Sequence, residues 1–162
     1  MGIVENVIIV LHNVFSSQKI VEAAKIAYGM GFKNFAITKA QGSAAQIGVP
    51  EAHKLAIKKK VNFFYLQSID DVIELFQPSE IYLFVPQGYA KEKFNPETIA
   101  EKASQKVVAI VFGVSEPGLY KKELEKGMPV YIENLKEHTT IGMLAIALYL
   151  ILNSAKFNTQ KY

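Results

Sequence analysis

The chain has 162 residues, of which 50% are hydrophobic and 20% are charged, and this is the composition of one ordinary globular domain. It contains no cysteine, which excludes disulfides, thiolate metal sites and cysteine nucleophiles. The 18 basic residues outnumber the 15 acidic ones and are all lysine, so any contact with phosphate must use ammonium rather than guanidinium groups. The net charge of +3 permits a nucleic-acid partner without demanding one.

No basic leader or cleavage site is visible at the start of the sequence, so we expect a cytoplasmic protein. The longest apolar run, residues 141–152, is shorter than the roughly 20 residues of a membrane-spanning helix, and a buried helix is expected there. His12, His53 and His138 are far apart in sequence, and no metal site is predicted.

Strand and helix patterns alternate along the whole chain. Short runs rich in β-branched and aromatic residues predict strands over 6–11, 34–38, 62–66, 80–85, 106–112 and 129–132. Helical periodicity and capping residues predict helices over 18–30, 50–60, 69–76, 96–104 and 139–154, with a short amphipathic stretch over 120–126. Residues 39–48 are expected to form a polar loop, and residues 155–162 a frayed tail.

This alternation predicts one α/β domain over 1–162, with a mostly parallel sheet of about six strands and helices on both faces. In such sheets ligands bind beyond the carboxyl ends of the strands. The loops that follow Leu11, Val85 and Phe112 are therefore the first places to look for a site.

A glycine-rich loop follows the most apolar strand. Gly113 and Gly118 allow a sharp turn and the close approach of a ligand to main-chain groups, and Pro117 stiffens the loop between them. The last helix is apolar on every side, so it must be covered by the rest of the chain, by a partner subunit, or by both.

These segments resemble the SPOUT superfamily and, within it, the SpoU-like RNA methyltransferases. Their pattern Gly-x-Glu-x-x-Gly-Leu after a strand is similar to VFGVSEPGL at 111–119. Their strand, loop and Ser-Leu-Asn before an Ala-rich helix are similar to PVYIENLKEHTTIGMLAIALYLIL at 129–152. Their first region, an Asn near the first strand and a helix closing in Ala-x-x-x-Gly, is similar to Asn13 and residues 27–31.

The resemblance implies a C-terminal trefoil knot over about 82–154, S-adenosylmethionine as cofactor, a homodimer, and methyl transfer to the ribose 2′-hydroxyl or a base nitrogen of rRNA or tRNA. It also implies the residues that bind the cofactor. They are Pro86, Gln87, Gly88, Phe112, Gly113, Gly118, Leu119, Ile132, Asn134, Leu135, Thr139, Thr140 and Met143.

The sequence departs from the family pattern at three places. Lys25 falls where the family has an arginine, the motif glutamate is one residue late at Glu116, and Thr139-Thr140-Ile141 replaces Ser-Leu-Asn. The catalytic candidates are then His12, Asn13, Lys25 and Glu116, with His12 considered as a base whose pKa lies near neutrality. Alternatively, His12 and Asn13 bond only local backbone, and Glu116 only caps a short helix.

Candidate RNA contacts are Ser43, Gln46, Lys54 and Lys58, although a flexible loop and a solvated helix face explain the same residues. Two rival functions stay open. One is an RNA-binding module that kept the fold and lost the chemistry. The other is a different α/β enzyme such as a nuclease, for which the strands show no metal-binding carboxylate cluster.

Overall fold

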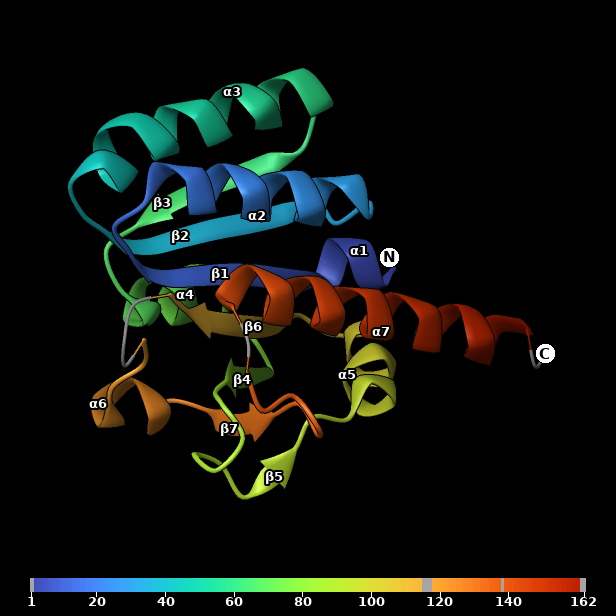
Figure 1. Ribbon diagram of the computed structural model, residues 1–162. Coiled ribbons are helices and arrows are strands. Elements are labelled where there is room, and N and C mark those ends of the chain that lie inside the picture. The colour runs from blue at the N-terminus through green and yellow to red at the C-terminus, as the bar shows by residue number, and fades with distance from the viewer. Residues whose placement is uncertain (1, 115–117, 138, 161–162) are drawn as a thin grey trace.

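The computed structural model describes the backbone of residues 2–114, 118–137 and 139–160, with side chains up to residue 154 (Figure 1). Its centre is a seven-stranded sheet in the order β3-β2-β1-β6-β4-β7-β5, and every neighbouring pair is parallel. The strands are β1 (Val7–Val14), β2 (Asn34–Ala40), β3 (Asn62–Leu66), β4 (Glu80–Phe84), β5 (Glu92–Lys93), β6 (Val108–Gly113) and β7 (Met128–Tyr131).

The helices fill the connections between these strands. They are α1 (Ile3–Asn6), α2 (Ser17–Gly29), the π-helix η1 (Ala44–Gly48), α3 (Val49–Lys59), α4 (Ile69–Phe76), α5 (Pro96–Ala103), α6 (Lys121–Leu124) and α7 (Thr140–Gln160). The Ser68 hydroxyl accepts a hydrogen bond from the Asp71 amide at 3.3 Å and so caps α4, as the sequence predicts. The predicted parallel α/β fold is confirmed.

Four details of the prediction are wrong. A seventh strand, β5, is present, and its two residues are too few to leave a sequence pattern. β1 runs three residues beyond Leu11, so His12 and Asn13 lie inside the strand instead of after it. The expected loop 39–48 contains the last two residues of β2 and the π-helix η1. α7 continues through the expected frayed tail to Gln160.

The two faces of the sheet are covered unequally. Ile9 and Leu11 of β1 point into the core cluster that contains residues of α2, α3, α5 and α7. Ile8 and Val10 point into a smaller cluster, which is covered by α4 together with Leu119. All eight residues of β1 are buried, because a central parallel strand is covered on both faces.

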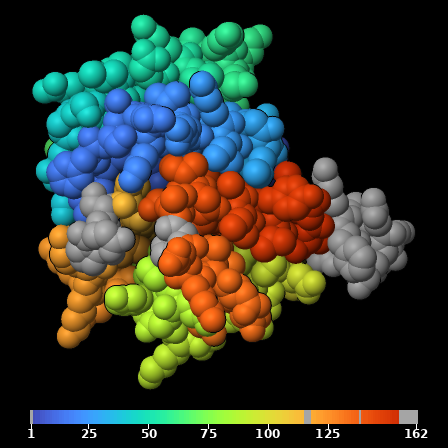
Figure 2. All heavy atoms as spheres, viewed as in Figure 1, coloured from blue at the N-terminus to red at the C-terminus, as the bar shows by residue number. Residues whose placement is uncertain are grey.

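α7 lies across the larger face, in front of β1 and β6 and between α2 and α5 (Figure 1). The space-filling view shows it as an orange-red band between the blue N-terminal half and the yellow-green segments below it (Figure 2). Within the described residues, no helix is long and apolar enough to span a membrane.

The strand order changes direction between β1 and β6. The strands β2 and β3 are added on one side of β1, and all later strands lie on its other side. The helix after β1 packs on the larger face, whereas Leu119, which follows β6, packs on the smaller face. The two connections diverge at the carboxyl ends of β1 and β6, and this switch point, called the crevice here, is the place where parallel sheets bind ligands.

Candidate functional site

The crevice is centred on His12. In the sheet register His12 lies beside Gly113 of β6 on one side and beside Thr38 of β2 on the other. The Val114 amide donates a hydrogen bond to the His12 carbonyl at 3.0 Å, so the sheet ladder continues to this point. Two groups of residues meet at this junction: the predicted cofactor segment beyond β6, and a set of side chains on β1, β2 and α6.

The cofactor segment is built on close contact between two glycines. A Cβ atom on Gly113 would lie 2.6 Å from the carbonyl carbon of Gly118, closer than real Cβ contacts come. Gly118 itself has φ +79°, in the left-handed region that favours glycine. The Thr140 hydroxyl, at the start of α7, donates to the Gly113 carbonyl at 3.0 Å. The structure therefore brings Gly113, Gly118 and Thr140 together, as the sequence predicts.

The first turn of α7 is closed by Thr139. Its hydroxyl accepts a hydrogen bond from the Gly142 amide at 2.9 Å, and its carbonyl accepts one from the Met143 amide at 2.9 Å. Met143 is buried in the larger core cluster. Thr139 thus caps α7.

Two further predicted loops follow the neighbouring strands β4 and β7. The Val85 amide donates to the Val130 carbonyl at 2.9 Å, which holds the start of the β4 loop against β7. Beyond it Gly88 has φ +102°, and beyond β7 Asn134 has φ +68°. The remaining predicted residues of these loops are Pro86, Gln87, Ile132 and Leu135.

The side chains of Phe112 and Leu119 belong to the core. Phe112 is fully buried and stacks on Phe84 with ring centroids 4.6 Å apart, and Leu119 packs into the smaller cluster. Their predicted part in cofactor binding is therefore limited to main-chain groups.

His12 is buried and only partly satisfied. Its Nδ1 lies 2.7 Å from the Thr38 hydroxyl, while its Nε2 is buried without a hydrogen-bond partner in the described structure. The nearest charged atom recorded for Nε2 is Oε1 of Glu123, at 3.9 Å. Burial lowers the pKa of His12 from 6.5 to about 4; Glu123 opposes this effect and Lys39 adds to it. The expectation of a pKa near neutrality is wrong, and the imidazole is neutral at pH 7.

The backbone beside His12 is strained. Asn13 has φ +65° and Lys39 has φ +53°, and both are non-glycine residues in the left-handed region. They lie on adjacent strands at the same level, where the β1–β2 register passes from His12–Thr38 directly to Val14–Ala40. Strain of this kind gathers at functional sites, because the surrounding structure must hold it in place.

α6 lies below the carboxyl end of β1 in Figure 1. The Tyr120 amide donates to Oε1 of Glu123 at 2.9 Å, which caps this short helix. The Lys39 ammonium lies 5.4 Å from the centroid of the Tyr120 ring. Thr38, Lys39, Tyr120 and Glu123 thus surround His12, and the sequence-based prediction assigned a role to none of the four.

The other predicted residues are scattered. Lys25 is exposed on α2, and no hydrogen bond or ion pair among the described residues joins it to His12. Glu116 lies outside the described residues. The Ser43 hydroxyl donates to the Phe15 carbonyl at 3.1 Å, which places it near the crevice. Gln46 is exposed on η1, and two predicted lysines are exposed on α3, namely Lys54 and Lys58.

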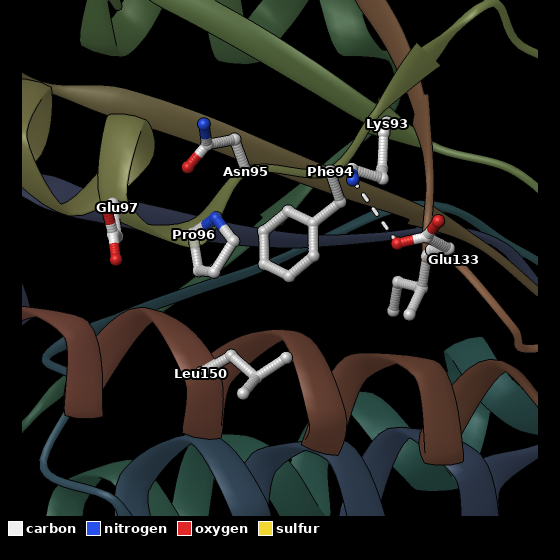
Figure 3. A pocket seen from close by; sticks show the side chains of 8 residues that line it. Lys93, Phe94, Asn95, Pro96, Glu97, Glu133 and Leu150 are labelled. Carbon is white, nitrogen blue, oxygen red and sulfur yellow. Dashed lines mark hydrogen bonds and ion pairs between the residues drawn. The ribbon is translucent and has the colours of Figure 1, made fainter.

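A cleft of about 400 Å³ lies between α7, the start of α5 and the loop that follows β7 (Figure 3). Leu150 points into it from α7, toward Phe94 and Pro96. The Lys93 ammonium and the Glu133 carboxylate pair across its rim at 3.2 Å, and both are exposed. Of the predicted cofactor residues, Ile132 is the one that lines it. The cleft therefore borders the predicted cofactor loops without containing the Gly113–Gly118 contact.

The solved structures that superpose on this chain include proteins described as methyltransferases. A Haemophilus influenzae Rd KW20 protein described as "a probable methylase family protein" superposes with a TM-score of 0.77 at 20% identity, over 99% of this chain and 69% of that one. The SpoU methyltransferase AviRb from Streptomyces viridochromogenes superposes with a TM-score of 0.69 at 10% identity, over 94% of this chain and 60% of that one. The chain therefore has the fold of the SpoU-type methyltransferases.

Sequence relatives carry a different description. The family described as "RecB-family nuclease (DUF2122)" matches residues 42–150, and the chain belongs to this family. A Methanocaldococcus jannaschii protein named "Putative type II restriction enzyme MjaORF1200P" is 37% identical over 142 residues, which cover 87% of this chain and 92% of that protein. The fold and the family description thus point to different chemistry.

Proposed function

We propose that the protein is an S-adenosylmethionine-dependent methyltransferase that acts on RNA. The observation that carries this proposal is the contact of Gly113, Gly118 and Thr140, in which two glycine backbones and the start of α7 meet beyond the central strand β6. Any side chain at Gly113 would force these segments apart. A segment that depends on glycine in this way suits a ligand read by main-chain groups.

The cofactor would be held by three loops, those over 86–88, 113–118 and 132–135. They follow β4, β6 and β7, which are neighbours in the sheet, so the three loops begin at the same edge. When bound there, S-adenosylmethionine supplies an electrophilic methyl group. The contribution of the protein is to hold this group and an RNA hydroxyl or base nitrogen in line, and such positioning is a large part of catalysis. The trefoil knot implied by the resemblance is part of the same proposal.

The name carried by the 37%-identical relative favours a nuclease as the second candidate. Metal-dependent nucleases hold one or two divalent ions with grouped carboxylates. Among the residues that the structure describes, no three His, Asp or Glu side chains are grouped to share an ion. The described residues therefore offer no ready ion site for a nuclease mechanism.

We propose that the protein is a homodimer. Residues 141–152 of α7 are apolar on all sides, and the outer face of this helix leaves Ile146, Tyr149 and Leu150 exposed by 37%, 60% and 38%. A second copy would cover this face, and light scattering at micromolar concentration would then give twice the monomer mass.

The proposal is tested by isothermal titration calorimetry with S-adenosylmethionine and S-adenosylhomocysteine, with ATP as the control ligand. We expect both sulfur nucleosides to bind in the micromolar range and ATP to bind far more weakly. Hydrogen exchange of the complex should show protection in the three loops and none in α3. If the protein binds neither sulfur nucleoside, the methyltransferase proposal is wrong and a non-catalytic RNA-binding module becomes the leading reading.

A further inference from the structure

The crevice edge beside His12 presents exposed aromatic side chains. Tyr120, at the start of α6, is 48% exposed, and Phe15, directly after β1, is 51% exposed. Both follow strands that meet at His12, so they belong to one edge of the sheet. Unpaired nucleobases stack on exposed aromatic rings of this kind.

Tyr120 is connected to His12 through Glu123. The Thr38 hydroxyl lies 2.7 Å from Nδ1 of His12, Nε2 of His12 lies 3.9 Å from Oε1 of Glu123, and this oxygen accepts a hydrogen bond from the Tyr120 amide. The ammonium of Lys39, the residue next to Thr38, lies 5.4 Å from the centroid of the Tyr120 ring. The His12 side chain thus lies against the residue that holds the start of α6, and we treat it as a positioning residue for Tyr120.

The exposed charges around this ring are mostly positive. Lys39 is exposed beside it, and Lys121 and Lys122 are exposed on α6. The nearest carboxylate, Glu123, is largely shielded at 15% exposure and already accepts a hydrogen bond. Ammonium groups beside an exposed ring match the phosphate and base of one nucleotide.

The buried Nε2 of His12 lies at the same place. It is a polar atom without a hydrogen-bond partner in the described structure, in a side chain that is 4% exposed, and it faces the group that holds Tyr120. A buried polar atom of this kind is unfavourable unless a ligand or water satisfies it. The backbone strain at Lys39 and Asn13 lies at the same place.

We propose that this edge binds an unpaired nucleotide of single-stranded RNA, with its base stacked on Tyr120 and its phosphate on Lys39. The inference rests on the proposed function: the bound nucleotide would be the methyl acceptor, held next to the cofactor loops. His12 and Gly113 are partners in the sheet register, so the two sites adjoin. Stacking requires an open base, and therefore a duplex is not the ligand.

The first test is fluorescence anisotropy with a labelled single-stranded RNA. Tyr120→Ala should weaken binding by roughly 5- to 150-fold, which is the range for loss of one base–aromatic stack, and Tyr120→Phe should keep it. Tyr65→Ala is the matched control, because Tyr65 is 51% exposed on the edge strand β3. Equal loss in the Tyr65 and Tyr120 variants, or wild-type binding by Tyr120→Ala, would contradict the proposed stacking.

The second test measures the phosphate contact by its dependence on salt. Lys39→Gln should weaken RNA binding and flatten the slope of log K against log salt by about 0.7, the value for one phosphate on a single strand. Lys106→Gln, an exposed lysine at the opposite edge of the sheet, should leave the slope unchanged. An unchanged slope for Lys39→Gln would place the phosphate elsewhere.

The role of His12 is tested by a double-mutant cycle. If His12 acts by positioning Tyr120, then His12→Gln weakens RNA binding in the wild-type background and has little further effect in Tyr120→Ala. Additive effects would contradict that role. S-adenosylmethionine binding is measured in the same variants: if it persists while none of them loses RNA affinity, this inference alone is wrong. Tighter binding of duplex DNA than of single-stranded RNA would also overturn it.

Discussion

The two sides of the His12–Gly113 pair are built in different ways. On the β6 side, Gly113 and Gly118 touch through their backbones, and the contact tolerates no side chain. On the β1–β2 side, the contacts are made by side chains from three elements, centred on a buried imidazole. The first arrangement suits a ligand held by main-chain groups, whereas the second suits a substrate selected by stacking and charge. In the proposed function, this difference separates cofactor binding from substrate choice.

The largest effect is expected at the backbone side. Gly113→Ala places a Cβ within 3 Å of three backbone atoms of Gly118, so the segment must shift as a whole. We expect the free energy of unfolding to fall by about 3 kcal/mol or more, at the upper end of overpacking costs. Urea unfolding followed by circular dichroism measures this loss.

Gly29→Ala is the control for that variant. Gly29 lies in α2 with nothing within 4 Å of the added Cβ, so the substitution should stabilise the protein by about 0.5–1 kcal/mol through helix propensity. A Gly113→Ala protein as stable as the Gly29→Ala protein would show that the glycine contact does not hold the segment.

On the side-chain side, the free energy of unfolding should depend on pH through His12. An unfolded His12 takes up a proton as the pH falls through 6.5, whereas the folded imidazole stays neutral until its pKa of about 4. The free energy of unfolding therefore falls between pH 6.5 and 4 and levels off below that, by at most about 3 kcal/mol from this group. Glu123 and Lys39 are the charged groups that face the imidazole.

His12→Gln removes this contribution. Between pH 7 and 4 the variant should lose less stability than the wild type, and the difference between their two curves isolates His12 from the titrating carboxylates. Parallel curves for the two proteins would mean that His12 is protonated in the folded state at the same pH as in the unfolded state.

The smallest effects are expected from the loss of one threonine hydroxyl on each side of the His12–Gly113 pair. Thr38→Val leaves Nδ1 of His12 buried and unpaired, which should cost about 2 kcal/mol. Thr140→Val removes one hydrogen bond to the Gly113 carbonyl and should cost about 1 kcal/mol. Thermal unfolding of both variants checks the order, and a larger cost at Thr140 would reverse the proposed contrast.

Much of the fold follows from local pattern. The apolar runs over 62–66 and 69–76 coincide with β3 and α4, because hydrophobic period and capping residues act over a few neighbours. The end of β1 is missed because His12 and Asn13 are polar, yet tertiary contacts bury both. β5 forms only because β7 offers it a parallel edge, and no local pattern records that.

The two sides of the crevice also differ in how many of their residues can be predicted from the sequence. Gly113, Gly118 and Thr140 were found because glycine spacing and a helix start are visible along the chain. Thr38 was within reach, since a strand–helix–strand unit places the ends of β1 and β2 side by side. Glu123 was not, because its contact with His12 depends on where α6 packs after the chain leaves β6. When the side chains of a site come from distant segments, their sequence spacing forms no recognisable motif, and sequence analysis cannot predict the site.

The central claim is that this fold transfers methyl groups although its family is described as nuclease. The most direct measurement incubates one preparation in parallel with tritiated S-adenosylmethionine and total RNA, and with Mg²⁺ and unmodified DNA. We predict tritium in the RNA, reduced by competing S-adenosylhomocysteine, and intact DNA. Magnesium-dependent DNA cleavage without tritium in the RNA would contradict the account.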